Sequence, residues 1–186
     1  MLEIRWHSRA GQGAVTGAKG LADVISGTGK KVQAFAFYGS AKRGASMTAY
    51  NRIDDETIIN HEKFMSPDYV LVIDPGLVFI TNICEFEKQD TKYIITTHLN
   101  KEELLAKKPE LKGKNIFIVD CIKISQEEIG KSVPNAPMLG AFIKVSGLLD
   151  LDFFLQAFKK VLGKKLPQVT IDQNMIAITR AYNEVK

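Results

Sequence analysis

A glycine-containing turn after the first apolar segment is the part of the sequence best suited to binding a ligand. Arg9 precedes Gly11, Gln12 and Gly13, and a predicted helix begins directly after them. Glycines let the backbone approach a ligand closely, and a helix start offers unpaired N–H groups and a positive dipole end. We predict that these four residues bind an anion, typically a phosphate, with Arg9 adding a charge-assisted contact. The alternative is that the glycines only allow tight strand–helix packing.

The turn departs from two familiar phosphate-binding patterns. The dinucleotide fingerprint requires its third glycine where this chain has Thr16, and the glycine stands at Gly17 instead. It also requires an acid at the end of the second strand, where this chain has Tyr38 and no acid. A P-loop is excluded because no Gly-Lys-Ser/Thr occurs.

A second glycine segment follows the second predicted strand and supplies further candidate contacts. Its candidate ligand-binding residues are Tyr38, Gly39, Lys42, Arg43 and Gly44. In a parallel sheet the first and second strands end at the same edge, where ligands of open α/β sheets bind. We therefore predict that both glycine segments face one ligand. Taken alone, the second segment also reads as a solvated basic turn.

Residues for redox, metal or covalent chemistry are scarce. The chain has two cysteines, Cys84 and Cys121, and a [4Fe–4S] cluster takes about four thiolates. Any redox centre must therefore come from another chain. His7, His61 and His98 are too dispersed for a metal site, and no nucleophile–base pair is evident from spacing. We assign no catalytic residue and no metal ligand to this chain.

Two aspartates stand where predicted strands end, a position that catalytic acids often occupy. They are Asp74, followed by Pro75 and Gly76, and Asp120, followed by Cys121. The Asp-Pro-Gly sequence favours a helix N-cap with a proline in the first turn. Cys121 is predicted to be buried and inert.

The elements that would position these residues follow from the apolar pattern. Strands are predicted at Leu2–Trp6, Lys31–Phe37, Met47–Ile53, Tyr69–Ile73, Tyr93–Thr97 and Asn115–Val119. Several are continuously apolar, as central strands covered on both faces are. Helical patterns lie between the strands and fill the last third, where a capping box at Thr170–Gln173 is predicted to open the final helix. We predict one α/β domain over residues 1–186, with an open, mostly parallel sheet, helices on both faces and a helical C-terminal third.

Composition excludes several classes of protein. The 186 residues carry 25 Lys+Arg and 21 Asp+Glu, a net charge of +4, and the lysines are scattered pairs without interleaved aromatics. We therefore expect no nucleic-acid partner. No segment approaches the ~20 apolar residues of a membrane helix, so we expect a cytoplasmic protein without a membrane partner. The small, proline-containing segment 135–140 is either a subunit interface or internal packing.

Five segments, in order along the chain, resemble the gamma subunit of 2-oxoacid:ferredoxin oxidoreductases, and most closely the pyruvate:ferredoxin or flavodoxin type. They read IRWHSRAGQGAVTGAKGLA, FAFYGSAKRGASMTAYNRID, SPDYVLVIDPGL, VPNAPMLGAFIKVSGLL and IDQNMIAITRAY. The resemblance covers essentially the whole chain, so it is far more specific than any single glycine pattern.

The resemblance implies an enzyme subunit without a complete active site. Such complexes convert a 2-oxoacid and coenzyme A into acyl-CoA and CO2 and reduce ferredoxin or flavodoxin. They use thiamine diphosphate, Mg²⁺ and [4Fe–4S] clusters carried by the alpha, beta and ferredoxin-like delta subunits, and this chain alone holds no cofactor. The gamma chain is implied to help bind coenzyme A and assemble the complex.

One departure concerns the second glycine segment. Many members carry a motif like SYGPEMRGG there, and this chain has FYGSAKRGA, with Lys42 where an apolar residue is common. Tyr38, Gly39, Arg43 and Gly44 keep their places. The departure resembles pyruvate-type chains. Alternatives are a purely structural docking subunit, the same role for another 2-oxoacid, and a free-standing nucleotide-binding protein.

Overall fold

A six-stranded sheet forms the centre of the molecule, in the order β2-β3-β1-β4-β5-β6. The computed structural model describes residues 1–38, 44–60, 62 and 64–186. The strands are β1 (Leu2–Arg9), β2 (Lys31–Tyr38), β3 (Ser46–Asp54), β4 (Tyr69–Val72), β5 (Lys92–Thr96) and β6 (Asn115–Val119). All six lie where the sequence predicts them.

One strand, β3, runs against the other five. It pairs antiparallel with both β1 and β2, whereas β1–β4, β4–β5 and β5–β6 are parallel pairs. Only residues 39–45 separate β2 from β3, and parallel neighbours need a crossover of a dozen residues or more. Because β3 is antiparallel to both of its neighbours, β1 and β2 run parallel to each other. These two strands therefore end at the same edge of the sheet. The prediction of a mostly parallel sheet is confirmed.

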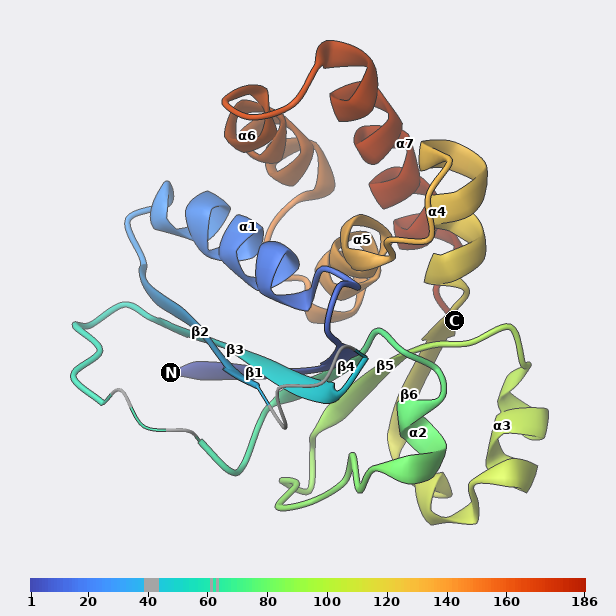
Figure 1. Ribbon diagram of the computed structural model, residues 1–186. Helices are drawn as coiled ribbons and strands as arrows, with labels where there is room; N and C mark the ends of the chain where they lie inside the picture. Colours follow the sequence, from blue (N-terminus) through green and yellow to red (C-terminus); the bar gives the residue numbers. More distant parts are fainter. Residues whose placement is uncertain (39–43, 61, 63) are drawn as a thin grey trace.

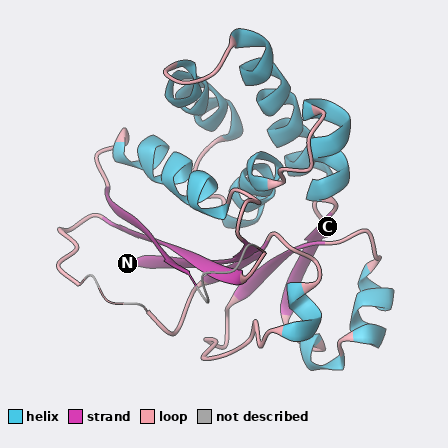
Figure 2. Ribbon diagram, viewed as in Figure 1, coloured by secondary structure: helices cyan, strands magenta, loops and turns pink. Residues whose placement is uncertain are grey.

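Helices cover both faces of the sheet, as predicted, but unequally (Figures 1 and 2). The long helices α1 (Ala14–Ser26), α5 (Asn135–Ser146), α6 (Leu151–Gly163) and α7 (Gln168–Glu184) gather on one side, with α4 (Cys121–Ile129) beside them. The opposite side carries α2 (Leu77–Ile80), α3 (Lys101–Lys107) and a 3₁₀ turn at Pro109–Leu111. The helical C-terminal third is confirmed.

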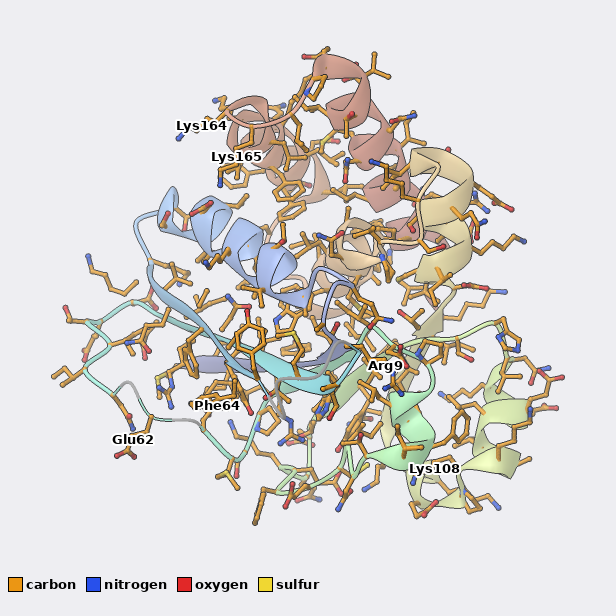
Figure 3. All side chains as sticks on the ribbon, viewed as in Figure 1. Arg9, Glu62, Phe64, Lys108, Lys164 and Lys165 are labelled. Atoms are coloured by element: carbon orange, nitrogen blue, oxygen red, sulfur yellow. The ribbon has the colours of Figure 1, made fainter. Side chains whose placement is uncertain are left out.

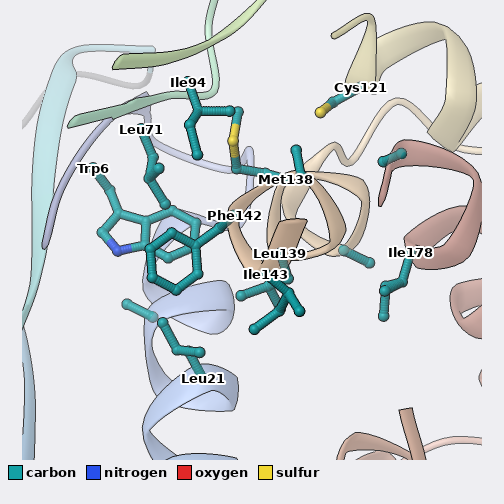
Figure 4. Close-up of a cluster of buried hydrophobic side chains, with 14 of the residues drawn as sticks. Trp6, Leu21, Leu71, Ile94, Cys121, Met138, Leu139, Phe142, Ile143 and Ile178 are labelled. Atoms are coloured by element: carbon teal, nitrogen blue, oxygen red, sulfur yellow. The ribbon is translucent and has the colours of Figure 1, made fainter. Parts of the chain in front are cut away.

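The larger core lies under the long helices (Figure 4). Trp6, Leu71 and Ile94 from three strands meet Phe142 of α5 there, and all four are fully buried. The indole N–H of Trp6 donates to Asn51 Oδ1 at 2.9 Å, so the one polar atom of this side chain is paired inside the core. A smaller core on the opposite face joins β4 and β5 to α2 and α3.

The segment 135–140 is internal packing. Residues Ala136 to Ile143 of α5 are all buried. A Cβ added to Gly140 would lie 2.1 Å from the carbonyl oxygen of Ile178 in α7, so the two helix backbones are in direct contact. The glycine permits this approach because it has no side chain.

Helices α3 and α7 begin in different ways. The Asn100 side chain and Glu103 form a capping box at the start of α3, with both hydrogen bonds at 2.9 Å. The prediction of a box at Thr170–Gln173 is wrong, because α7 begins earlier, at Gln168, with Pro167 at the N-cap position. Proline lacks an N–H and is tolerated at a helix start, where that donor has no intrahelical partner.

None of the helices in the described part of the chain combines the length and apolar composition needed to span a bilayer.

Candidate functional site

The candidate site lies where the strand order of the sheet reverses. From β1 the chain passes through α1 to β2 on one side, and from β4 it passes through α2 to β5 on the other. β1 and β4 are parallel neighbours, so the turns that follow them lie side by side at one edge. Ligands of open α/β sheets bind in the crevice at such a reversal.

The first glycine turn opens α1 at this edge. Gly11 and Gly13 have φ angles of 98° and 87°, in the left-handed region that favours glycine. Gly13 is the N-cap residue of α1, and neither a side-chain cap nor an acidic residue occupies the first turn of this helix. Within the described residues, then, no side chain caps the amide groups at the start of α1, and such amides together with the helix dipole are suited to bind an anion.

Gln12 fixes the shape of this turn with its side chain. Its Oε1 accepts from the Arg9 backbone N–H at 2.8 Å and from Ser8 Oγ at 3.2 Å. Its Nε2 donates to Asp74 Oδ2 at 2.6 Å. Gln12 thus joins the turn after β1 to the turn after β4.

Arg9, which is labelled in Figure 3, makes the second link, to Gly44 just before β3. Its Nη1 donates to the Gly44 carbonyl at 3.0 Å, and the Ala10 N–H donates to the Ala45 carbonyl at 3.3 Å. Arg9 of the first glycine segment therefore contacts Gly44 of the second, whereas their binding of one ligand stays a prediction. Tyr38 ends β2 with 68% of its surface exposed. The candidates Gly39, Lys42 and Arg43 lie outside the described residues.

Asp74 contacts two residues of the candidate site, although the sequence pattern assigned it another role. α2 begins at Leu77 with Gly76 in the N-cap position, so the prediction that Asp74 caps this helix is wrong. One carboxylate oxygen instead accepts from the Gly76 N–H at 2.9 Å, and the other lies 3.3 Å from Arg9 Nε. The available signal was the position of Asp74 at the end of a central strand.

A cavity of about 560 Å³ adjoins this turn, over the ends of β5 and β6. Pro75 forms its border with the Asp74 turn, and Thr96, Thr97 and His98 line it from the end of β5. Asp120 lines it from the end of β6, where its side chain caps α4 by accepting from the Lys123 N–H at 2.9 Å. Neither threonine was predicted as a site residue, although their place after an apolar strand was the available signal.

Redox and metal chemistry have little support among the described residues. No group of three or more His, Cys, Asp or Glu side chains gathers there in a way that could hold a metal ion. Both cysteines are free, and Cys121 is fully buried, as predicted. Burial raises the pKa of Cys121 to about 12, and burial also raises the pKa of the partly exposed Cys84.

These pKa shifts predict unequal thiol reactivity. At pH 8 we expect a maleimide reagent to label Cys84 slowly in the folded protein and to label Cys121 only after unfolding, since the reactive species is the thiolate. Labelling of Cys84 should accelerate as the pH rises toward its raised pKa. Mass spectrometry of native and urea-unfolded samples measures this. Cys84→Ser should abolish native labelling, and rapid labelling of Cys121 in the folded protein would contradict the expectation.

Comparisons with known proteins agree over the whole chain. The family model described as pyruvate ferredoxin/flavodoxin oxidoreductase matches residues 3–184. Pyruvate synthase subunit PorC of Thermotoga maritima is 42% identical over 184 residues, which cover 99% of this chain and 94% of that protein. The pyruvate/ketoisovalerate oxidoreductases common subunit gamma of Thermococcus kodakarensis is 38% identical, covering 99% and 97%.

Solved structures give the same result for the fold. The crystal structure of pyruvate oxidoreductase subunit PORC from Thermotoga maritima matches with a TM-score of 0.83 and 40% identity, covering 100% of this chain and 97% of that one. A 2-oxoglutarate:ferredoxin oxidoreductase from Magnetococcus marinus contains the same fold in 30% of its chain, with a TM-score of 0.76 and 16% identity. Because the family model and the relatives match essentially the full length, this chain belongs to the pyruvate ferredoxin/flavodoxin oxidoreductase family.

Proposed function

We propose that this chain is the gamma subunit of a multi-subunit pyruvate:ferredoxin or flavodoxin oxidoreductase. The complex converts pyruvate, coenzyme A and an oxidised acceptor into acetyl-CoA, CO2 and the reduced acceptor. Full-length relatives named as pyruvate synthase subunit PorC and as common subunit gamma support this assignment. The alternative within the same family is another 2-oxoacid as substrate.

Within that complex, we propose that this chain contributes to coenzyme A binding and to assembly. The supporting observation is the convergence of Arg9, the uncapped start of α1 and the β2–β3 connection at the strand reversal. Coenzyme A carries a diphosphate and a 3′-phosphate, and backbone amides at a helix start together with arginines are suited to bind phosphates. Gly11, Gln12 and Gly13 would meet the ligand with backbone groups, and Arg43 would pair with a phosphate.

The redox and thiamine chemistry belongs to the partners in this proposal. Thiamine diphosphate, Mg²⁺ and [4Fe–4S] clusters would be held by alpha, beta and delta subunits, since this chain has only two cysteines. The proposed compartment is the cytoplasm, where thiols such as Cys84 and Cys121 stay reduced.

Hydrogen exchange in the assembled complex tests the binding role. Coenzyme A should slow amide exchange in residues 9–17 and 38–44 and leave the exposed turn after α6 unchanged. Protection at neither segment would favour the rival proposal, a docking subunit that orders its partners and touches no ligand. A stable monomer that copurifies with no other subunit would contradict the complex itself.

Arg43→Ala provides the matching kinetic test. Loss of a charge-assisted phosphate contact is expected to raise the KM for coenzyme A about tenfold or more, because such bonds contribute roughly 1.5–3 kcal/mol. Lys164→Ala is the control, since it removes one positive charge from an exposed position away from Arg9 (Figure 3). An unchanged KM and an unchanged pyruvate-driven rate in Arg43→Ala would remove Arg43 from the site.

A further inference from the structure

The Asp74 carboxylate makes three contacts at the candidate site, two hydrogen bonds and one ion pair. Its Oδ2 accepts from Gln12 Nε2 at 2.6 Å and lies 3.3 Å from Arg9 Nε, while its Oδ1 accepts from the Gly76 N–H. The carboxylate side chain is 13% exposed, and that of Arg9 is 35% exposed. Asp74 is therefore held in place from three directions but remains within reach of a ligand at the edge.

The charge at this point is balanced before any ligand arrives. Arg9, just before the turn that opens α1, supplies a cation, and Asp74 is its ion-pair partner. The guanidinium also contacts a neutral group, the Gly44 carbonyl. An anion bound against α1 must share Arg9 with a carboxylate that is already there.

We propose that Asp74 sets the affinity of this site by competing with the anionic ligand for Arg9. When a phosphate approaches, Arg9 exchanges one carboxylate oxygen for a phosphate oxygen, and Asp74 keeps its bonds to Gly76 and Gln12. Asp74 is thus a positioning residue that acts through Arg9. The identity of the ligand as coenzyme A rests on the proposed function, whereas the competition applies to any phosphate at this edge.

A carboxylate in this place has a functional rationale. Binding that is equally tight before and during reaction lowers KM without raising kcat, and a product that carries the same phosphates must also leave the site. A carboxylate beside the cation weakens the bound state of substrate and product alike. An asparagine in its place could accept from the Gly76 N–H with its single oxygen, but it would offer no acceptor to Gln12 and Arg9 and no charge to Arg9.

The test is a double-mutant cycle in the assembled complex. The variants are Asp74→Asn, Arg9→Gln and the double variant, and calorimetry measures the Kd of coenzyme A and, separately, of inorganic pyrophosphate. We expect Asp74→Asn to bind both probes about three- to fivefold more tightly, which corresponds to about 0.6–1 kcal/mol, the upper part of the range for a partly exposed ion pair. In the Arg9→Gln background the same change should have less than a twofold effect, because the competition acts through Arg9.

Asp74→Ser is a second variant without the charge, and it shows whether a folding defect explains the result for Asp74→Asn. A serine hydroxyl can accept from the Gly76 N–H in a similar turn, so this variant also removes the charge while retaining the turn. Both variants should unfold within a few degrees of the wild type. The gain in affinity should shrink at high salt, since the electrostatic contribution is screened.

The outcomes separate this inference from the proposed function. If the wild-type complex binds coenzyme A at residues 9–13, but the charge-removing variants bind it equally or more weakly, the competition is refuted and the proposed function stands. Equal gains in the presence and absence of Arg9 also refute it. If pyrophosphate binds as expected and coenzyme A does not, the competition stands and the ligand assignment falls. Binding of neither probe overturns both.

Discussion

Gly140→Ala is expected to destabilise this protein by about 3 kcal/mol or more. The added methyl would lie 2.1 Å from the carbonyl oxygen of Ile178 and 2.8 Å from its carbonyl carbon. These are backbone atoms, so no side chain can rotate away, and α5 and α7 must separate. Overpacking a core typically costs about 1–3 kcal/mol and sometimes more, and separating two helix backbones belongs at the upper end.

The position of α5 explains why the molecule cannot relax around this change. α5 lies between the sheet and α7, and its residues Ala136 to Ile143 are buried on all sides (Figure 4). For a chain of about this size, 1 kcal/mol corresponds to roughly 2–4 °C in Tm, so we expect a loss of about 6–12 °C by differential scanning fluorimetry.

Gly163→Ala is the matched control for this prediction. Gly163 ends α6, a Cβ added to it would meet no atom of the described residues within 4 Å, and its φ is not in the left-handed region. Alanine there should be neutral or stabilising by less than about 1 kcal/mol. A Gly140→Ala variant that melts like Gly163→Ala would show that the backbones of α5 and α7 are not in direct contact.

Gly140→Ala is also expected to change the candidate site. Asn135, the first residue of α5, lies against Gly13, where an added Cβ would be 2.9 Å from its side chain. A shift of α5 therefore changes the support of the turn that opens α1. Coenzyme A affinity should fall together with stability in Gly140→Ala, whereas neither should fall in Gly163→Ala.

Local patterns predicted the strands well because continuous apolar segments have few alternatives in a sheet covered on both faces. Tyr69–Val72 and Asn115–Val119 are of this kind, and both lie within the predicted ranges. The direction of β3 was not predicted, although the short 39–45 connection before it carried the signal. The start of α7 was missed because Thr170 and Gln173 match a capping box, whereas Pro167 sets the boundary.

The sequence predicts which residues form the turn at the candidate site, but it does not predict the hydrogen bonds that these residues make with distant parts of the chain. Arg9 and the glycines are adjacent in sequence, so their turn could be inferred from local chemistry. The bond from Gln12 to Asp74 joins residues 62 positions apart, and the bond from Arg9 to Gly44 joins residues 35 apart. Such pairings depend on which strands become neighbours, and a single sequence does not reveal strand order. Arg9 was therefore predicted as a cation available to a ligand, and the structure shows it paired with Asp74.

Gln12→Glu is expected to weaken coenzyme A binding strongly, because it places a second carboxyl group against Asp74. The substitution keeps the shape of the side chain and replaces the Nε2 donor, 2.6 Å from Asp74 Oδ2, with a carboxylate oxygen. Two carboxylates at this distance cannot both remain ionised and in place. The introduced carboxylate either takes up a proton or turns toward the start of α1, where it occupies the site of the anion.

We expect the KM for coenzyme A to rise at least about tenfold in Gln12→Glu at pH 8, with kcat at saturating coenzyme A within about twofold of the wild type. A raised KM with an unchanged kcat indicates lost binding and intact chemistry, because the reacting centre lies elsewhere in the complex. Gln89→Glu is the control, since it adds the same charge at an exposed position in the loop before β5. Its KM should not change.

The pH dependence supplies a sharper criterion than the size of the effect. A protonated carboxyl group donates a hydrogen bond to Asp74 as the amide does, so the variant regains the wild-type contact when its new group is neutral. The neighbouring carboxylate raises the pKa of that group, and the ratio of variant to wild-type KM should therefore fall as the pH is lowered from 8 to 6. A ratio that stays constant over this range would mean that the defect comes from the shape of the turn and not from charge. A KM equal to that of Gln89→Glu at every pH would mean that coenzyme A does not meet this edge of the sheet at all.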